Sequence, residues 1–379
     1  GSPLLSFLLC SLCTPLQGLG FSNLIYLHMR LEEFYKSVDD SKVNVFFIEE
    51  PESHMHPQMQ NVFIRFLTKY YTEKKLQGLI TTHSNEIARS VGLNSLRVIR
   101  QTEKSKSELF NLSKFRKSIE NKKVKNVDKE SEFLLQNFFD WFFEIGYSEL
   151  IFADKVILYE GDTERLYIRK LLGMTEFASL RDNYIAFIQV GGAYAHNYLE
   201  ILTMLKMKSL IITDLDYNKD ATTFEIAKNS TSTNATINHC YRLIYPEKGA
   251  AYLPSIKEIY EMQTEKGTVI CNDLICVAYQ DENSTARTLE EAMLNKFLSK
   301  NVFDKTKRSE WKSIRKNNNL TFTIPNNRND ETDSEFSIRQ IVAASSNNKT
   351  DFMYSVVLSG NEEKMLPDYI RKGLLWLAK

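Results

Sequence analysis

The alternation of apolar runs and amphipathic stretches between residues 153 and 217 constrains the fold of this 379-residue chain more than any other feature. The apolar runs read KVILYEG, IAFIQVGG and SLIITDLD, and the stretches between them read TERLYIRKLL and HNYLEILTMLKM. Strands that alternate with helices in this way build a parallel sheet whose faces are covered by the helices. The sequence therefore predicts an α/β unit here.

Acidic residues stand where the first and the third of these predicted strands end. Glu160 ends the first strand, Glu164 follows one helical turn later, and Asp214 and Asp216 end the third strand on one shared face. Ligands of parallel sheets bind beyond the carboxyl ends of the strands, and carboxylates crowded there repel one another unless cations neutralise them. Hard oxygen ligands favour Mg²⁺ or Mn²⁺. The pattern predicts a metal site, although Glu164 alone would also suit the helix dipole.

A second α/β pattern occupies residues 1–100. A helical stretch at 24–38 precedes the apolar run VNVFFIEE, and another at 58–71 precedes GLITTHS. Continuous apolar runs of this kind are typical of parallel strands that are covered on both faces. We therefore expect a separate α/β domain at the start of the chain.

Several residues of this first domain have the chemistry of a nucleotide site. A carboxylate at a strand end can hold the Mg²⁺ of a nucleotide, a second can polarise water, and N–H groups at a helix start can contact phosphate. The candidate nucleotide-binding residues are Glu49 for the metal, Glu50 as base, His83 as phosphate sensor, and Gly18, Gly20 and Ser22 at a helix start. Taken singly, the glutamates would serve equally well as a helix cap and the histidine as a structural residue.

The remaining segments divide the chain further. Residues 101–150 are expected to form a basic connector and an aromatic helix, since 97–129 carry a net charge of +7. Residues 151–379 are expected to hold the second domain, with an irregular insertion at 217–240 and a largely helical C-terminal part. Lys+Arg and Asp+Glu are equal at 48 each, so nucleic acid could be held only by local patches such as 97–129 or 296–316.

The five cysteines argue against a disulfide framework and fit a reducing cytosol. Cys10 and Cys13 form a CxxC with no second pair nearby to complete a zinc site, so we interpret them as small core residues. The apolar start is too short to span a bilayer. We expect a cytoplasmic protein with no membrane partner.

The order of motifs in residues 1–100, with EEPE after an apolar run and a histidine after the next, resembles the signature, Walker B, D-loop and H-loop series of ABC-type ATPases in the RecF/SMC-like branch. The resemblance implies the C-terminal half of such a domain. The sequence contains no phosphate loop of the form G-x-x-x-x-G-K-S/T. ATP could bind only if residues outside this sequence or another chain supply that loop; otherwise the module serves as a dimerisation platform.

The segments VILYEGDTE and ITDLD resemble the first motif and the DxD motif of Toprim domains. An ABC-type ATPase half followed by a Rossmann-like Toprim domain resembles the nucleases of the overcoming-lysogenization-defect (OLD) family, including the nuclease subunit of Gabija-type defence systems. The resemblance implies two-metal cleavage of phosphodiester bonds. It makes Glu160 the central ligand, which also handles a proton, with Glu164, Asp214 and Asp216 completing the sites.

Two further positions follow from the same resemblance. The family's TLE motif matches ARTLEEAM, which implies Glu290 as a further metal ligand and leaves Glu291 as an alternative. A downstream lysine that stabilises the charged transition state matches Lys349 in NKTDFMYS, where a surface lysine is equally compatible with the pattern. His196 is interpreted as structural, and Gly191 with Gly192 as a tight turn.

The implied function is a DNA endonuclease or nickase of antiphage defence, regulated by its ATPase module. The implied partners are DNA, a second copy of the chain bound through the ATPase domain, and a helicase or other defence protein. The alternatives are a RecF-like ATPase that clamps DNA without cutting it, a topoisomerase or primase, and a scaffold without activity. The last would hold only if the acidic residues bind no metal.

Overall fold

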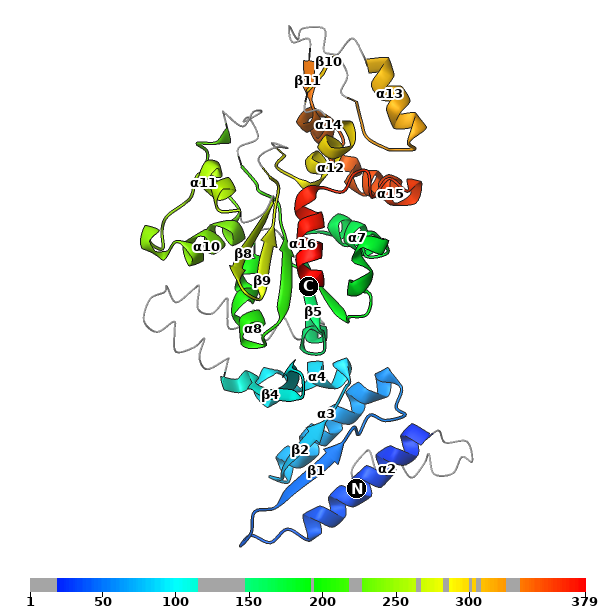
Figure 1. The fold of residues 1–379 in the computed structure, drawn as a ribbon. Coiled ribbons are helices and arrows are strands. Elements are labelled where there is room, and N and C mark those ends of the chain that lie inside the picture. The colour runs from blue at the N-terminus through cyan, green and yellow to red at the C-terminus, as the bar shows by residue number, and fades with distance from the viewer. Residues whose placement is uncertain are drawn as a thin grey trace. The chain divides into compact units, whose positions relative to one another are not determined.

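The computed structural model describes residues 19–114, 147–191, 194–217, 227–263, 267–281, 286–299, 302–304, 308–324 and 335–379. The chain divides into two compact units, residues 1–152 and 153–379 (Figure 1). The division falls two residues beyond the expected start of the second domain at residue 151. Each unit has its own hydrophobic core.

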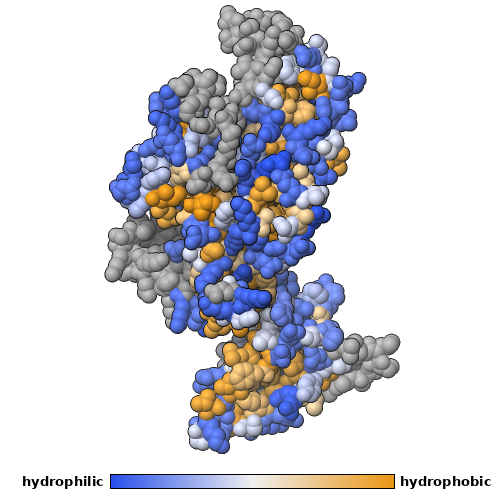
Figure 2. Space-filling view, in the orientation of Figure 1, coloured by the Kyte–Doolittle hydropathy of each residue, from blue (hydrophilic) through white to orange (hydrophobic). Residues whose placement is uncertain are grey.

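The first unit contains two parallel strands packed against helices. Strand β1 (Val45–Glu49) pairs in parallel with β2 (Gln77–Thr81), and the helices are α2 (Leu19–Lys36), α3 (Pro57–Glu73) and α4 (Asn85–Val91). The core forms where α3 buries Phe63, Ile64 and Leu67 around Phe46 of β1. Because consecutive side chains of a strand point to opposite faces, Phe47 and Leu79 lie on the other face and are 74% and 57% exposed. Figure 2 shows hydrophobic residues at the surface of this unit.

The N-terminal part of the segment that was expected to be a basic connector forms a β-hairpin. Strands β3 (Arg97–Glu103) and β4 (Lys106–Asn111) pair antiparallel around a turn in which Ser105 has a φ of +65°. The positive charge of this segment suggested a solvated connector, but consecutive side chains of a strand point to opposite faces, so Val98 is buried while Ile99 is 69% exposed. The expected aromatic helix lies outside the described residues.

The second unit is built on a five-stranded sheet of order β6-β5-β7-β9-β8. Its strands are β5 (Lys155–Tyr159), β6 (Ile185–Gln189), β7 (Lys208–Ile212), β8 (Thr268–Asn272) and β9 (Ile275–Ala278). Strands β6, β5, β7 and β9 run parallel, and β8 is antiparallel to β9. The sheet confirms the predicted α/β class, and its central strands are buried because helices cover both faces.

The helices around this sheet explain that burial. Helices α7 (Asp162–Leu171) and α16 (Asp368–Ala378) pack on one face, and α8 (Leu199–Met204) and α10 (Ala235–Ile244) lie on the other (Figure 1). A Cβ atom at Gly373 would lie 2.8 Å from the side chain of Leu210, so this glycine allows α16 to approach the sheet closely. Helix α10 begins within the segment that was expected to be irregular, because Asn234 caps it.

The C-terminal part is largely helical, as predicted. It contains α12 (Leu289–Leu298), α13 (Arg308–Asn317), α14 (Ile338–Ala344) and α15 (Lys349–Ser359), together with the short strands β10 (Val302–Asp304) and β11 (Glu335–Ser337). Helix α11 (Ile256–Glu261) precedes β8. The described 3₁₀ helices are η1 (Leu93–Ser95), η2 (Tyr147–Ile151), η3 (Thr175–Leu180), η4 (Ala195–Tyr198), η5 (Pro246–Lys248) and η7 (Ser346–Asn348).

One disulfide bond corrects the expectation from the cysteine content. Cys240 of α10 is bonded to Cys271 of β8, with their Cα atoms 5.9 Å apart, whereas Cys276 is a buried free thiol. The expectation was wrong for this pair because sequence spacing does not reveal which cysteines meet in space. Cys10 and Cys13 lie outside the described residues. No helix in the described part of the chain is long and apolar enough to cross a membrane.

Candidate active site

Glu160 lies directly after β5, next to the end of β7. The two strands are in parallel register, with Leu158 beside Ile211, so the residues that follow them meet at one edge of the sheet. The hydroxyl of Thr213 and the N–H of Asp214 both donate to the same carboxylate oxygen of Glu160, the latter at 3.0 Å. Burial raises the pKa of Glu160, although these two hydrogen bonds act in the opposite direction.

Glu164 turns back toward this edge from the first turn of α7. A Cβ atom at Gly161 would lie only 3.0 Å from a carboxylate oxygen of Glu164, so the glycine leaves the room that this side chain occupies. Burial raises the pKa of Glu164 to about 7, and the nearby carboxylates of Glu290 and Glu160 act in the same direction. Glu164 thus lies near Glu160 and Glu290, and the helix dipole alone does not account for its position.

Asp214 and Asp216 lie in the loop after β7 and not in the strand, which corrects the expectation that they share a strand face. The side-chain amide of Gln280 donates to Asp214 at 2.8 Å. Asp216 has a φ of +45°, a left-handed conformation that aspartate tolerates better than most residues. Burial and the carboxylate of Glu160 raise the pKa of Asp214 well above its usual range, and burial also raises that of Asp216.

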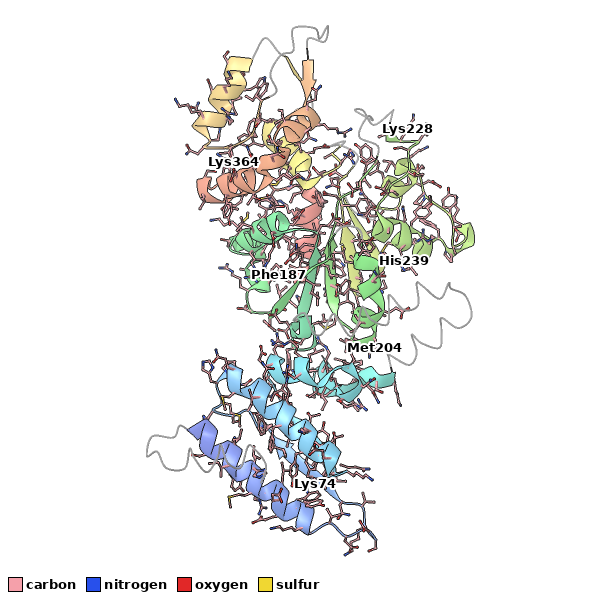
Figure 3. The ribbon with its side chains drawn as sticks, turned by 180° about the vertical axis from the view of Figure 1, so that it is seen from behind. Lys74, Phe187, Met204, Lys228, His239 and Lys364 are labelled. Carbon is pink, nitrogen blue, oxygen red and sulfur yellow. A yellow bond between two sulfur atoms is a disulfide. The ribbon has the colours of Figure 1, made fainter. Side chains whose placement is uncertain are left out.

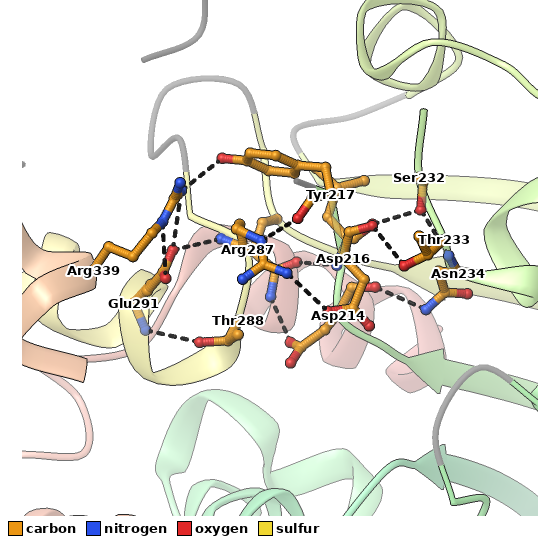
Figure 4. A network of polar contacts seen from close by, with 12 residues as sticks. Asp214, Asp216, Tyr217, Ser232, Thr233, Asn234, Arg287, Thr288, Glu291 and Arg339 are labelled. Atoms are coloured by element: carbon orange, nitrogen blue, oxygen red, sulfur yellow. Dashed lines mark hydrogen bonds and ion pairs between the residues drawn. The ribbon is translucent and has the colours of Figure 1, made fainter. Parts of the chain in front are cut away.

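Glu290 and Lys349 reach the same place from α12 and α15. A carboxylate oxygen of Glu290, in the first turn of α12, lies 3.3 Å from the ammonium nitrogen of Lys349, the first residue of α15. Burial would lower the pKa of Lys349, but Glu290 and other carboxylates outweigh burial and raise it. Glu291, the alternative to Glu290, instead pairs with Arg339 at 3.2 Å (Figure 4).

The five carboxylates, named here the acid cluster (Glu160, Glu164, Asp214, Asp216 and Glu290), have the donor chemistry that Mg²⁺ and Mn²⁺ prefer. Several of them raise one another's pKa, so the cluster favours added positive charge. No three of the described His, Cys, Asp and Glu side chains, however, already form a coordination shell. The residues fit a divalent ion in kind, and their side chains must turn toward a common point to bind it.

Three residues that hold the acid cluster escaped the sequence analysis: Thr213, Asn234 and Gln280. The amide of Asn234 donates to the Thr213 hydroxyl at 2.6 Å and to the backbone carbonyl of Asp214 at 2.8 Å. Its carbonyl oxygen accepts from two N–H groups in the first turn of α10. Gln280 accepts from the N–H of Leu215 at 2.7 Å while it donates to Asp214. Of the three, only Thr213 could have been suspected from the sequence, because it directly precedes Asp214.

His196 lies outside the acid cluster, as expected for a structural residue. Its backbone N–H donates to the hydroxyl of Thr236, and its ring lies 5.4 Å from that of His239 on α10, which Figure 3 labels. Burial lowers the pKa of His239, which favours the neutral form. Gly192 lies outside the described residues, so the predicted tight turn stays a prediction.

In the first unit, the candidates after β1 and β2 lie together. Glu49 is the exposed last residue of β1, and Glu50, with a φ of +40°, lies 3.3 Å from the ring of His83. Glu52, which the sequence analysis missed, accepts from the Thr82 hydroxyl at 2.6 Å and from the N–H of His83 at 3.0 Å. These contacts join the loops that follow the two strands.

Two of the three helix-start candidates, Gly20 and Ser22, belong to the first turn of α2. Gly20 packs against the loop after β1, because a Cβ atom there would lie 2.6 Å from the carbonyl oxygen of His54. Asn23 donates to the carbonyl of Pro51 at 3.2 Å in the same loop. Ser22 is exposed, and Gly18 lies outside the described residues. Gly20 therefore has a packing role that does not depend on phosphate.

Comparisons with known families agree with both halves of this description. Residues 14–88 match the AAA ATPase domain, and residues 151–216 match the TOPRIM domain of overcoming lysogenization defect protein-like proteins. The chain thus carries an ATPase-like segment followed by an OLD-like TOPRIM domain, which confirms the resemblance seen in the sequence.

The chain is homologous to bacterial nucleases. It is 28% identical to the endonuclease GajA of Bacillus cereus (strain HuB5-5) over 394 residues, which cover 96% of this chain and 53% of GajA. It is 28% identical to the OLD nuclease of Thermus scotoductus over 164 residues, 42% of this chain and 28% of that protein. The C-terminal region of the Burkholderia pseudomallei OLD protein superposes with a TM-score of 0.34 at 17% identity, covering 60% of this chain and 98% of that one. The chain spans about half the length of the GajA protein that it matches.

Proposed function

We propose that this chain is a metal-dependent DNA endonuclease or nickase whose active site is the acid cluster. The observation that carries the proposal is the convergence of five carboxylates and Lys349 at one edge of the sheet, from segments up to 189 residues apart in sequence. Like charges gathered in this way are costly unless a cation binds among them. The homologues named as endonuclease and nuclease support the same reading.

The proposed roles follow from the positions of the side chains. The acid cluster would hold Mg²⁺ or Mn²⁺, which supplies Lewis-acid activation of water and of the phosphate. Glu160, with a raised pKa, would accept a proton from the attacking water. Lys349 would stabilise the negative charge that develops on the phosphate oxygens, because its ammonium group is already drawn to this edge by Glu290.

The first unit would regulate this site. Glu50, the proposed base, lies 3.3 Å from the ring of His83, the proposed phosphate sensor, in the loops after the two strands. ATP would bind only when residues outside this sequence, or another chain, supply the phosphate loop. We further propose a homo-oligomer formed through the ATPase domain, DNA as substrate, a cytoplasmic location, and a role in antiphage defence with a helicase or another partner.

The test is cleavage of supercoiled and linear DNA with Mg²⁺ or Mn²⁺. Wild type is compared with Glu160→Gln and Asp214→Asn, and with Asp162→Asn as a matched control, because Asp162 is an exposed acid of the same helix start outside the acid cluster. The proposal expects metal-dependent cutting that both cluster variants abolish and the control retains. Cutting that survives in both cluster variants would contradict it.

A second candidate is a RecF-like DNA-binding ATPase or a scaffold that does not cut. It is favoured by one observation, namely that the described acids do not already form a metal coordination shell. It predicts DNA or partner binding that is indifferent to Glu160→Gln. An absence of cutting at saturating Mn²⁺, with DNA still bound, would make this candidate the better account.

A further inference from the structure

Glu291 and Arg339 form an ion pair that is almost closed to solvent. The guanidinium Nε lies 3.2 Å from one carboxylate oxygen of Glu291, and the side chains are only 15% (Arg339) and 5% (Glu291) exposed. Arg339 belongs to α14 and Glu291 to α12, so the pair joins two helices. A nearly buried pair of this kind fixes geometry more firmly than an exposed one, because neither charge can turn to water without losing its partner.

Tyr217 connects this ion pair to the loop after β7. The guanidinium of Arg339 donates to the Tyr217 hydroxyl at 3.0 Å (Figure 4). Arg287 also contacts Tyr217, because its guanidinium Nε donates to the backbone carbonyl of Tyr217. The backbone N–H of Arg287 donates to a carboxylate oxygen of Glu291 at 2.8 Å. Both guanidinium groups also lie within 6 Å of the Tyr217 ring, at 5.4 and 5.7 Å from its centroid. The four residues form one connected network.

The network connects two acids of the acid cluster that come from different parts of the chain. Tyr217 is the next residue after Asp216, and Glu291 is the next residue after Glu290. Arg287 also lies 3.9 Å from a carboxylate oxygen of Asp216. Holding Tyr217 and Glu291 together therefore limits how far Asp216 and Glu290 can move apart.

We propose that Glu291, Arg339 and Tyr217 are positioning residues that set the distance between Glu290 and Asp216, and thereby the affinity of the acid cluster for a divalent cation. This proposal rests on the proposed metal-dependent function. A simpler reading of Glu291 is available, because T-L-E-E has the pattern of a capping box and Thr288 accepts from the N–H of Glu291. A capping box accounts for neither Arg339 nor the Tyr217 hydroxyl.

The experiment compares Arg339→Gln, Arg339→Lys and Tyr217→Phe with wild type in the full 379-residue chain. Lys296→Gln is the matched control, because it also removes an ion pair of α12. Lys296 lies in the last turn of α12, at the end away from Glu291, and is 2.7 Å from Asp368 of α16. The first measurement is the Mn²⁺ concentration that gives half of the maximal rise in melting temperature, without DNA. The second is the Mn²⁺ dependence of kcat and the KM for DNA.

The proposal expects Arg339→Gln to raise the Mn²⁺ midpoint by about 10-fold or more, as losses of residues that orient metal ligands do. Tyr217→Phe should raise it by about 2- to 10-fold, since one hydrogen bond is lost. Arg339→Lys should recover part of the loss, because it keeps the charge but not the fork that serves both partners. The KM for DNA and the Lys296→Gln midpoint should stay at wild-type values.

Two results would overturn the proposal. One is a Mn²⁺ midpoint for Tyr217→Phe and Arg339→Gln that stays within about twofold of wild type; Tyr217→Phe decides if Arg339→Gln does not fold. The other is an equal shift in Lys296→Gln, which would show a general effect on α12. If wild type binds Mn²⁺ and cuts DNA, these results overturn the positioning proposal alone. If wild type shows neither metal response nor cutting, the proposed function fails as well.

Discussion

The ammonium nitrogen of Lys349 lies 3.3 Å from a carboxylate oxygen of Glu290, although 59 residues separate them in sequence. The carboxylates of Asp214 and Glu164 also raise the pKa of this lysine. Lys349 thus supplies positive charge to the acid cluster of the metal-free protein. A substrate phosphate would bring further negative charge to the same place, which gives the lysine a second partner in the proposed reaction.

Replacing Lys349 should therefore affect the chemical step. Lys349→Gln is expected to lower kcat by about 10²- to 10³-fold with little change in KM, because it removes a group that would bind developing charge. Lys364→Gln is the control, since Lys364 is an exposed lysine of the same unit (Figure 3). Single-turnover cleavage rates are the measurement. A wild-type rate for Lys349→Gln would show that it is an ordinary surface lysine.

The stability of the metal-free protein should fall as pH rises from about 4.5 to about 7. The pKa of Glu164 is raised by burial from 4.5 to about 7. Between these values the unfolded state releases the proton that the folded state keeps, so rising pH favours unfolding. The loss is up to about 3 kcal/mol, and less where water screens this partly exposed carboxyl.

Urea unfolding in EDTA at several pH values measures this loss. Glu164→Gln should flatten the pH dependence between 4.5 and 7, and added Mn²⁺ should do so in wild type. An equal slope in Glu164→Gln and wild type would assign the effect to other groups.

Asn234 should matter both as a helix cap and as a hydrogen-bond donor. Asn234→Ala is expected to reduce the free energy of unfolding by about 1–3 kcal/mol and to lower cleavage, because it removes the cap of α10 and two donors. Asn234→Asp keeps the capping oxygen but not the donors to Thr213 and Asp214. Comparing cleavage rates at matched folded fractions separates the two roles. If Asn234→Asp cleaved DNA at the wild-type rate, Asn234 would act only as a helix cap.

The disulfide between Cys240 and Cys271 should stabilise the second unit. The bond closes a loop with a sequence separation of 31 residues, so its reduction should lower the free energy of unfolding by about 3–4 kcal/mol in the chain-entropy account. Urea unfolding with and without dithiothreitol measures the change, and Cys240→Ala should not respond to the reductant. Peptide mapping that finds both cysteines as free thiols in the untreated protein would contradict the structure.

The strand ends of the acid cluster were predictable because parallel strands place their carboxyl ends at one edge. That rule brought Glu160 and Asp214 together from two apolar runs. The resemblance added Glu290 and Lys349, but the sequence could not separate Glu290 from Glu291, since that choice depends on how α12 is turned. In the structure Glu291 pairs with Arg339, whereas Glu290 pairs with Lys349.

The residues that support the acid cluster could not be predicted in the same way. Asn234 and Gln280 lie 20 and 66 residues beyond Asp214 and reach it through loops whose course depends on the packed fold. The β3–β4 hairpin was not predicted, because a high density of lysine and arginine indicates only that a segment is exposed to solvent. An irregular connector and a surface hairpin are both exposed, so the charge does not distinguish them.

The central claim is that the acid cluster binds divalent cations, and the location of Mn²⁺ tests it most directly. Crystals of the chain grown with Mn²⁺ would be measured for the anomalous scattering of manganese. The account predicts a peak about 2.1 Å from carboxylate oxygens of Glu160 and Asp214, the distance that a small divalent ion requires. Two results at saturating Mn²⁺ would contradict the claim. One is manganese peaks that lie only outside the acid cluster, and the other is the absence of any peak in crystals in which Lys349 still pairs with Glu290.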